Sequence, residues 1–512
     1  MATYNCLDAP GRFEINICII NAFKFSAIEM KSKKLISFAG VFAACAALSA
    51  AEYNYAGLGD YYSIDDPGSW SPTPEDGVKN SYSWFAGKTF VFDSVAVPDA
   101  AAGAEVKYFS DENQPHIEKL ILKTSASLKG AEGGAYAPTI TVDNLEMYSD
   151  AESGLNHKLL RFRQIKIGSA TIGANSASPV AKTTIFHMSF RDNGSAYYYN
   201  SAADSFVSAD IGRVTLNGAL PTNPNDQNTV LWYLNDQAGD NKTSSVAVVR
   251  VNGIDGVGIV RNNLANDASG TTTLVFSNTS DASFKGVLMD DWVDPSKFAK
   301  LHIVMDGAAG ATQTIRQTSD WDTSVWNRAD LDSVGTTIKN GTLAISSAPK
   351  GSSLVESARV RIEGGALAVA QTDADGAGGS LRVRGVDWVG GKIKVAINRG
   401  QLLSTNGIAQ LGGDGAKYVF EVDLSDFAPD TAFEGDEFSL LVSDSGSYGD
   451  ISKYEAEFVY NGVEISGLEY EILSTAHGLN ISLIGTIPEP AEAAALFGLA
   501  AVLLSAARRR RR

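Results

Sequence analysis

Short apolar stretches that alternate with polar residues dominate the chain from Glu52 to Ile487. Clear examples are residues 88–92, 139–142, 184–188, 246–249 and 301–304. Val, Ile, Thr and Phe are frequent in them, and every second side chain would share one face, as in a half-buried β-strand. No long amphipathic helix is evident over this interval. The nearest candidate, residues 155–167, also has a strand pattern, so the sequence predicts an all-β fold.

The clearest internal repeat lies in the last third of the chain, in residues 338–345, 362–369 and 389–395. Each copy combines a strand, a glycine turn and another strand. The equivalent residues Leu343, Leu367 and Ile393 are 24 and 26 positions apart. Such spacing is close to one turn of a right-handed parallel β-helix, whose stacked turns share one apolar core. We expect a β-solenoid over residues 87–416, with antiparallel hairpins in a β-sandwich as the alternative.

Two flanking segments differ from this body and are expected to close its ends. Residues 52–86 combine aromatic side chains with three prolines and would cap the first strand, whose open edge must be covered. An aromatic platform that binds sugars is the alternative for this segment. Residues 417–487 are acidic, with longer alternating stretches, and are expected to form a terminal β-module. The aromatic residues of the first segment include Tyr53, Tyr55, Tyr61, Tyr62, Trp70 and Trp84.

A segment near the beginning has the pattern of a signal peptide. Residues 30–34 are basic, residues 35–48 are apolar, and Ser49 and Ala51 place small side chains where a cleavage site needs them. Residues 30–51 are therefore predicted to direct the chain to the Sec export machinery. Translation is expected to begin at Met30, with residues 1–29 as an upstream extension.

A second apolar segment, residues 491–507, stands near the end of the chain. As a helix it would be about 25 Å long, close to the ~30 Å hydrocarbon core of a bilayer. Pro488, Glu489 and Pro490 precede it. We expect one C-terminal transmembrane helix, with a basic tail that stays on the cytoplasmic side. That tail consists of Arg508, Arg509, Arg510, Arg511 and Arg512.

The three parts of residues 488–512 together resemble the PEP-CTERM sorting signal of Gram-negative bacteria: a Pro-Glu-Pro motif, a short membrane helix and a basic end. The resemblance implies processing by exosortase, a membrane transpeptidase, and an association with exopolysaccharide. An ordinary membrane anchor is the alternative. The strand-turn-strand repeats resemble those of autotransporter passenger domains, which are also common in PEP-CTERM surface proteins.

Composition limits the partners of the exported body. Without the two targeting segments the chain keeps 32 basic and 54 acidic residues, a net charge of −22. Nucleic acids and anionic membranes would repel such a body, so nucleic-acid binding is not expected. Cys6, Cys18 and Cys45 all precede the predicted cleavage site, so the mature chain would have neither disulfides nor thiolate metal sites.

Candidate catalytic residues are few. The five histidines are scattered without metal-ligand spacing, and those at positions 187 and 302 lie in strand patterns, where solvent-facing or hydrogen-bonded side chains are expected. No nucleophile elbow, phosphate-binding loop or His-Glu-x-x-His motif is present. Residues 373–376 resemble the start of a calcium loop but lack its fifth-position ligand and distal glutamate, so a turn is preferred. The histidines are His116, His157, His187, His302 and His477.

Acidic residues beside tryptophans are the strongest sign of chemistry. Two carboxylates that flank a sugar, with an aromatic ring beneath it, are the arrangement of glycosidases. In so acidic a body, solvated loops are the preferred interpretation. The residues concerned are Asp290, Asp291, Trp292, Asp320, Trp321, Asp322, Trp326, Asp330 and Asp332.

These observations favour a non-enzymatic protein of the cell surface or extracellular matrix, without a cofactor or a metal. It would be exported, held by its C-terminal helix until processing, and associated with exopolysaccharide. A carbohydrate-binding or polysaccharide-degrading β-helix protein is the alternative. That alternative rests on the analogy that parallel β-helices can host polysaccharide lyases.

Overall fold

The computed structural model describes eighteen stretches between Glu52 and Ile487. Contacts between Cα atoms divide the chain between Ala51 and Glu52, and all described residues belong to the second unit. The described residues are 52–55, 67–77, 81–92, 104–106, 114–123, 127–130, 139–148, 155–173, 184–190, 207–220, 229–236, 246–263, 271–290, 300–316, 332–346, 355–369, 380–397 and 401–487.

Strands are the dominant element in this part of the chain, and no α-helix occurs in it. The predicted all-β fold is therefore confirmed. Residues 155–167, the nearest helix candidate, belong to two strands, Leu155–Phe162 and Gln164–Gly173. Three short 3-10 helices complete the described elements: η2 (Pro67–Ser69), η3 (Ser83–Phe85) and η7 (Ile451–Lys453).

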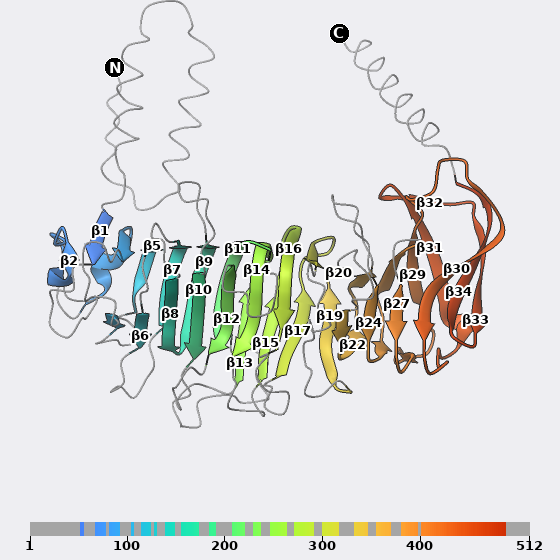
Figure 1. Ribbon diagram of the computed structural model, residues 1–512, viewed down its shortest axis with the longest axis horizontal. Helices are drawn as coiled ribbons and strands as arrows, with labels where there is room; N and C mark the ends of the chain where they lie inside the picture. The colour runs from blue at the N-terminus through green and yellow to red at the C-terminus, as the bar shows by residue number, and fades with distance from the viewer. Residues whose placement is uncertain are drawn as a thin grey trace, which may run out of the picture. The chain divides into compact units, whose positions relative to one another are not determined.

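Most strands fall into series in which each strand pairs in parallel with the one before and the one after (Figure 1). The first series is β1 (Glu52–Tyr55), β3 (Thr89–Phe92), β5 (His116–Leu122), β7 (Thr139–Met147), β9 (Gln164–Gly173), β11 (Ala209–Asn217), β13 (Val246–Val251), β15 (Thr271–Phe276), β17 (Lys300–Asp306), β19 (Val334–Asn340), β22 (Arg359–Ile362), β25 (Val386–Trp388) and β28 (Ile408–Gln410).

The second series consists of the strands that follow these in the chain, and it also pairs in parallel. It is β4 (Ala104–Val106), β6 (Ser127–Gly130), β8 (Leu155–Phe162), β10 (Thr184–Phe190), β12 (Val230–Asp236), β14 (Ile254–Asn263), β16 (Ala282–Met289), β18 (Thr312–Arg316), β20 (Thr342–Ser346), β23 (Ala366–Val369), β26 (Lys392–Ala396), β29 (Tyr418–Asp423) and β31 (Tyr454–Tyr460).

A third, shorter parallel series begins in the last third of the chain. It is β21 (Val355–Ser357), β24 (Leu381–Val383), β27 (Leu402–Ser404) and β30 (Ala432–Ser443). In this region the chain therefore passes through three strands before it returns to the same series, whereas earlier it passes through two. The third series lies in a separate six-stranded sheet.

The register of the second series matches the sequence repeat. Leu343 pairs with Leu367, and Leu367 pairs with Ile393. All three side chains are fully buried. The copies thus occupy equivalent positions in neighbouring parallel strands, and the antiparallel-hairpin alternative is wrong for these strands.

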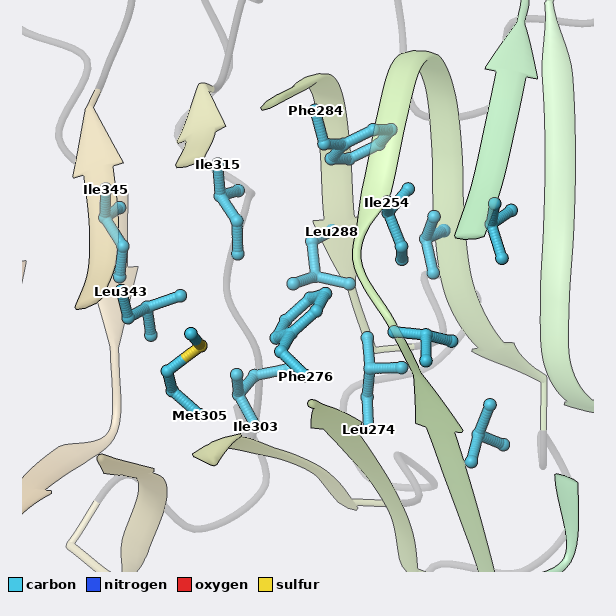
Figure 2. Close-up of a cluster of buried hydrophobic side chains, with 14 of the residues drawn as sticks. Ile254, Leu274, Phe276, Phe284, Leu288, Ile303, Met305, Ile315, Leu343 and Ile345 are labelled. Atoms are coloured by element: carbon cyan, nitrogen blue, oxygen red, sulfur yellow. The ribbon is translucent and has the colours of Figure 1, made fainter. Parts of the chain in front are cut away.

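Buried side chains from the first and second series meet in one apolar core (Figure 2). Leu274, Phe276, Ile303 and Met305 come from the first series, and each contacts its neighbours along the stack of strands. The second series contributes the side chains that face them. Those labelled in Figure 2 are Ile254, Phe284, Leu288, Ile315, Leu343 and Ile345.

Glycines allow the sharp turn from the first to the second series. Gly341 and Gly391 have positive φ angles of 73° and 76°, which favour glycine. A Cβ atom on Gly391 would lie 2.1 Å from the carbonyl oxygen of Gly365 in the adjacent turn. Glycine at position 391 is therefore required by both backbone conformation and close packing.

Aromatic residues close the N-terminal end of the first series. The short strand β2 (Trp70–Ser71) pairs antiparallel with β1. Tyr53, Trp70 and Trp84 are 7%, 2% and 3% exposed and pack with Phe85 and Phe90. The alternative of a sugar-binding platform is wrong for these three residues, because their rings face the core. Tyr61 and Tyr62 lie outside the described residues, and the side chain of Tyr55 is not described.

Antiparallel strands close the C-terminal end. The strand β32 (Val463–Ile465) forms a hairpin with β31. The turn of that hairpin contains Asn461 and Gly462, both with positive φ, as a two-residue hairpin loop prefers. The strand β34 (Gly478–Thr486) lies between β30 and β33 (Glu469–Thr475) and pairs antiparallel with both. The pairing direction thus differs on the two sides of β30, which is parallel to β27 and antiparallel to β34.

Candidate functional site

The predicted group of acidic residues and tryptophans is only partly described. Asp290 is 2% exposed, and its carboxylate accepts a hydrogen bond from the backbone N–H of Leu301 at 3.0 Å. Asp332 is exposed and forms an ion pair with Arg384, with 2.9 Å between Oδ1 and Nε. The interpretation of Asp290 as a solvated loop residue is wrong, because this carboxylate fixes the start of β17. The other residues of the group, and residues 373–376, lie outside the described part.

The histidines lie on different elements, with His157 on β8 and His187 on the adjacent strand β10. His116 lies on β5, where its Nε2 is 2.9 Å from Asp143 Oδ1, and both side chains are about half exposed. His302 is on β17 and His477 in the turn before β34. Among the residues that the structure describes, no group of three or more His, Cys, Asp or Glu side chains could hold a metal ion.

A second apolar cluster covers part of the sheet face opposite the core. On β12, the side chains of Val230, Trp232 and Leu234 belong to the core, whereas the intervening Leu231 and Tyr233 belong to this cluster. Strand alternation therefore places the cluster on the outward face. We call it the outer-face patch, and it consists of Leu231, Tyr233, Ile259, Val287 and Met289, with Ile185 packed against it.

Two basic side chains, His187 and Arg261, lie beside Tyr233 of the outer-face patch. His187, Tyr233 and Arg261 occupy paired positions on β10, β12 and β14. The ring centroids of His187 and Tyr233 are 4.6 Å apart, and the guanidinium carbon of Arg261 is 4.4 Å from the Tyr233 ring centroid. Arg261 Nη2 also donates a hydrogen bond to the Tyr233 hydroxyl. His187 is 7% exposed, so it does not face solvent, and its ring belongs to a packed cation–aromatic stack.

Buried amides form a further polar cluster that the sequence analysis missed. Gln313 is fully buried and acts as a substitute for a strand partner: its Oε1 accepts from Ile254 N and its Nε2 donates to Ile254 O, both at 3.0 Å. Asn278 Nδ2 donates to Gln313 Oε1 at 3.2 Å. These bonds satisfy backbone groups at the turn before β14, so the cluster serves the structure of that turn. An isolated amide in an alternating stretch gives no sequence signal of this role.

A ladder of ion pairs joins the last strands of the second series. Lys392 on β26 contacts Glu457 on β31 and lies 3.6 Å from Glu421 on β29. Lys394 pairs with Glu421 at 3.0 Å. The pKa of Lys392 is raised, chiefly by its hydrogen bond with Glu457, while burial acts in the opposite direction. This ladder neutralises carboxylates on the outward face of these strands.

The antiparallel strands near the C-terminus lack such compensation: β30, β33 and β34 carry five acidic residues and no lysine or arginine. Residues 417–487 contain 14 acidic residues and two basic ones, Lys417 and Lys453. More than half of the net charge of the predicted exported body is therefore concentrated in this segment. Of the two lysines, Lys417 pairs with Glu455 at 3.1 Å. The described end of the chain is thus strongly acidic.

Three exposed side chains lie in one row across this sheet. The register places Ile484 of β34 between Glu434 of β30 and Glu469 of β33. Ile484 is 51% exposed and both glutamates are exposed, whereas the neighbouring Leu483 is fully buried. The row therefore faces away from the core. Together with the exposed Asp430, we call these side chains the C-terminal rim.

Asp430 of the C-terminal rim is hydrogen-bonded to Ile487, the residue that precedes the predicted sorting motif. Ile487 is fully buried; its N–H donates to Thr431 O at 3.0 Å and its carbonyl accepts from Asp430 N at 3.2 Å. The chain is therefore held in the fold as far as Ile487. The predicted motif residues Pro488, Glu489 and Pro490 follow at once and lie outside the described residues, as do Ser49, Ala51 and Arg508 to Arg512.

No helix in the described stretches is long and apolar enough to cross a membrane. The segment predicted to do so, residues 491–507, lies beyond them. Comparison with protein-family models, with curated proteins and with solved structures finds no match to this chain.

Proposed function

We propose that this chain is an exported structural protein of the cell surface or extracellular matrix, built on a parallel β-solenoid and sorted by a PEP-CTERM and exosortase-type system. The observation that carries the proposal is the shared register of Leu343, Leu367 and Ile393 in consecutive parallel strands. Such repetition extends a fold by identical steps, which suits a spacer or scaffold. Exopolysaccharide is the proposed partner outside the cell.

Two covered strand edges support the same role. Stacked parallel strands leave an open edge at each end, and open edges promote association with other chains. Here β2 covers β1 at the start of the first series, and β32 pairs with β31 at the end of the second series. Covering these two edges would limit association with other chains before the protein reaches its final location.

The solenoid can be tested by a disulfide in the cysteine-free mature chain. Thr337 and Arg361 are partners in adjacent parallel strands, and both side chains point away from the core. We expect Thr337→Cys with Arg361→Cys to form a disulfide on mild oxidation, since neighbouring strands bring Cα atoms within disulfide range. The pair Thr337→Cys with Arg359→Cys, two residues out of register, should stay reduced. Equal cross-linking of both pairs would contradict the register.

Sorting can be tested in a bacterium that carries the processing enzyme. Replacement of Pro488, Glu489 and Pro490 by alanine is expected to leave the protein in the inner membrane. The measurement is fractionation of the full chain into membrane, surface and medium, compared with the unchanged protein. Normal release of the alanine variant would show that the motif has no role in sorting.

A further inference from the structure

The position of Ile487 limits how far the predicted membrane helix can begin from the folded sheet. Its side chain is buried and both its backbone groups are hydrogen-bonded, so no flexible linker precedes the motif. Only residues 488–490 separate it from the apolar segment that begins at Ala491. Fully extended, that link spans at most about 14 Å between the Cα atoms of Ile487 and Ala491. The lipid headgroup layer takes up about 5–8 Å of this distance.

An enzyme that cleaves within residues 488–490 must therefore work in contact with the folded end of the sheet. The C-terminal rim belongs to that end. Asp430 is bonded to Ile487 itself, and the row of Glu434, Ile484 and Glu469 lies two to three residues up the same strands. The substrate that the enzyme meets is thus a short extended peptide together with a rigid protein surface.

The chemistry of the C-terminal rim defines the kind of surface that fits it. Its charged members are all acidic, and no lysine or arginine occurs between Tyr454 and Ile487. Ile484 adds an exposed apolar side chain between two carboxylates. An apolar contact surrounded by charges of one sign is the pattern of a docking surface for a partner of opposite charge.

We propose that the C-terminal rim is a docking surface for the processing enzyme, which would present a basic, partly apolar surface beside its active site. This inference rests on the proposed function. Anionic lipid headgroups are excluded as the favourable partner because they would repel Asp430, Glu434 and Glu469. The rim would hold the enzyme while the Pro-Glu-Pro segment enters its active site.

The test compares release of full-length variants in cells that carry the processing enzyme. Glu434→Lys with Glu469→Lys reverses the rim and is expected to slow release at least tenfold, because like charges then face each other in the encounter. The matched control reverses two exposed acids away from the rim, Asp414→Lys with Asp444→Lys, and should be released at the normal rate. Asp444 follows the opposite end of β30.

A linker variant separates docking from other effects of charge. Six Gly and Ser residues inserted between Ile487 and Pro488 let the enzyme reach the motif without touching the rim. In that background, reversal of Glu434 and Glu469 should slow release less than twofold. Resistance of each purified variant to protease checks that the sheet is intact.

The outcomes distinguish this inference from the proposed function. If the alanine variant of the motif is retained but the rim reversal is released at the normal rate, rim docking is wrong and sorting by the motif stands. Equal slowing by rim reversal with and without the linker also overturns docking. Normal release of the alanine variant would remove the proposed function, and this inference with it.

Discussion

The parallel strand series and the C-terminal antiparallel sheet share the same alternating sequence pattern but differ in how much of each strand is buried. In the series, a strand such as β15 is paired on both sides, and every second side chain is fully inside. In the antiparallel sheet, β33 is paired by β34 alone among the described strands, and most of its side chains are exposed. Stability is thus concentrated in the series, whereas the sheet presents a surface.

The arrangement of charged side chains also differs between the strand series and the antiparallel sheet. In the last turns of the series, Lys392 and Lys394 compensate the carboxylates of neighbouring strands. In β33, Glu469 and Glu471 lie on an edge strand, where like charges discourage pairing with another chain. This difference shows that an alternating pattern alone does not distinguish a core-forming strand from an edge strand that discourages pairing with other chains.

The largest expected effect comes from the core of the series. Trp388 is fully buried, with its ring 5.4 Å from Tyr418 and 5.2 Å from Phe420. Trp388→Ala should lower the free energy of unfolding by about 3–5 kcal/mol, because it leaves a large cavity. Tyr470→Ala on β33, where the side chain is 39% exposed, should cost about 1 kcal/mol. Denaturant unfolding measures both, and equal losses would remove the contrast between the regions.

Two glycines with nearly the same backbone angle give a sharper comparison. Gly391 has φ of 76° and Gly462 has φ of 77°. A Cβ atom at Gly462 meets no atom within 4 Å. Gly462→Ala should therefore lower the free energy of unfolding only by the backbone strain of a positive φ angle, about 1 kcal/mol. Gly391→Ala adds a clash with Gly365 O and should cost about 3 kcal/mol. A smaller loss of unfolding free energy for Gly391→Ala than for Gly462→Ala would show that the turns of the series are not tightly stacked.

The smallest expected effect concerns the ion-pair ladder. Lys392→Met should cost less than about 1 kcal/mol, since the side chain is more than a third exposed. The pKa of Lys392 lies above its ordinary value of 10.5, so its contribution is fully present below that pH and is lost as pH rises through the folded-state value. The stability difference from the unchanged protein should therefore vanish at high pH. A difference that instead grows with pH would contradict the ion-pair origin.

The sequence allowed the strands and part of their register to be predicted, because period-two alternation and the 24- and 26-residue spacing reflect direct pairing. The same register continues where no repeat is visible. Ile165 pairs with Ala209, 44 residues later, and Ala209 pairs with Val249, 40 residues later. Connections of variable length hide the period there, although the strands still stack.

The polar features could not be predicted in this way. Alternation assigns His187 to the outward face correctly, but it cannot say that the outward face is itself buried at this place. The same limit applies to Asp290, whose burial depends on the backbone of Leu301 in the next strand. Both depend on contacts with another strand, which a local pattern does not encode.

Equivalent positions for Leu343, Leu367 and Ile393 also bear on how such a gene can change. In-frame loss or duplication of one such unit would move everything downstream by a single strand spacing, about 4.8 Å, and leave both termini as they are. Unequal recombination between the coding segments would therefore produce alleles of graded length. The distance that the protein bridges could then evolve in small steps without a new fold.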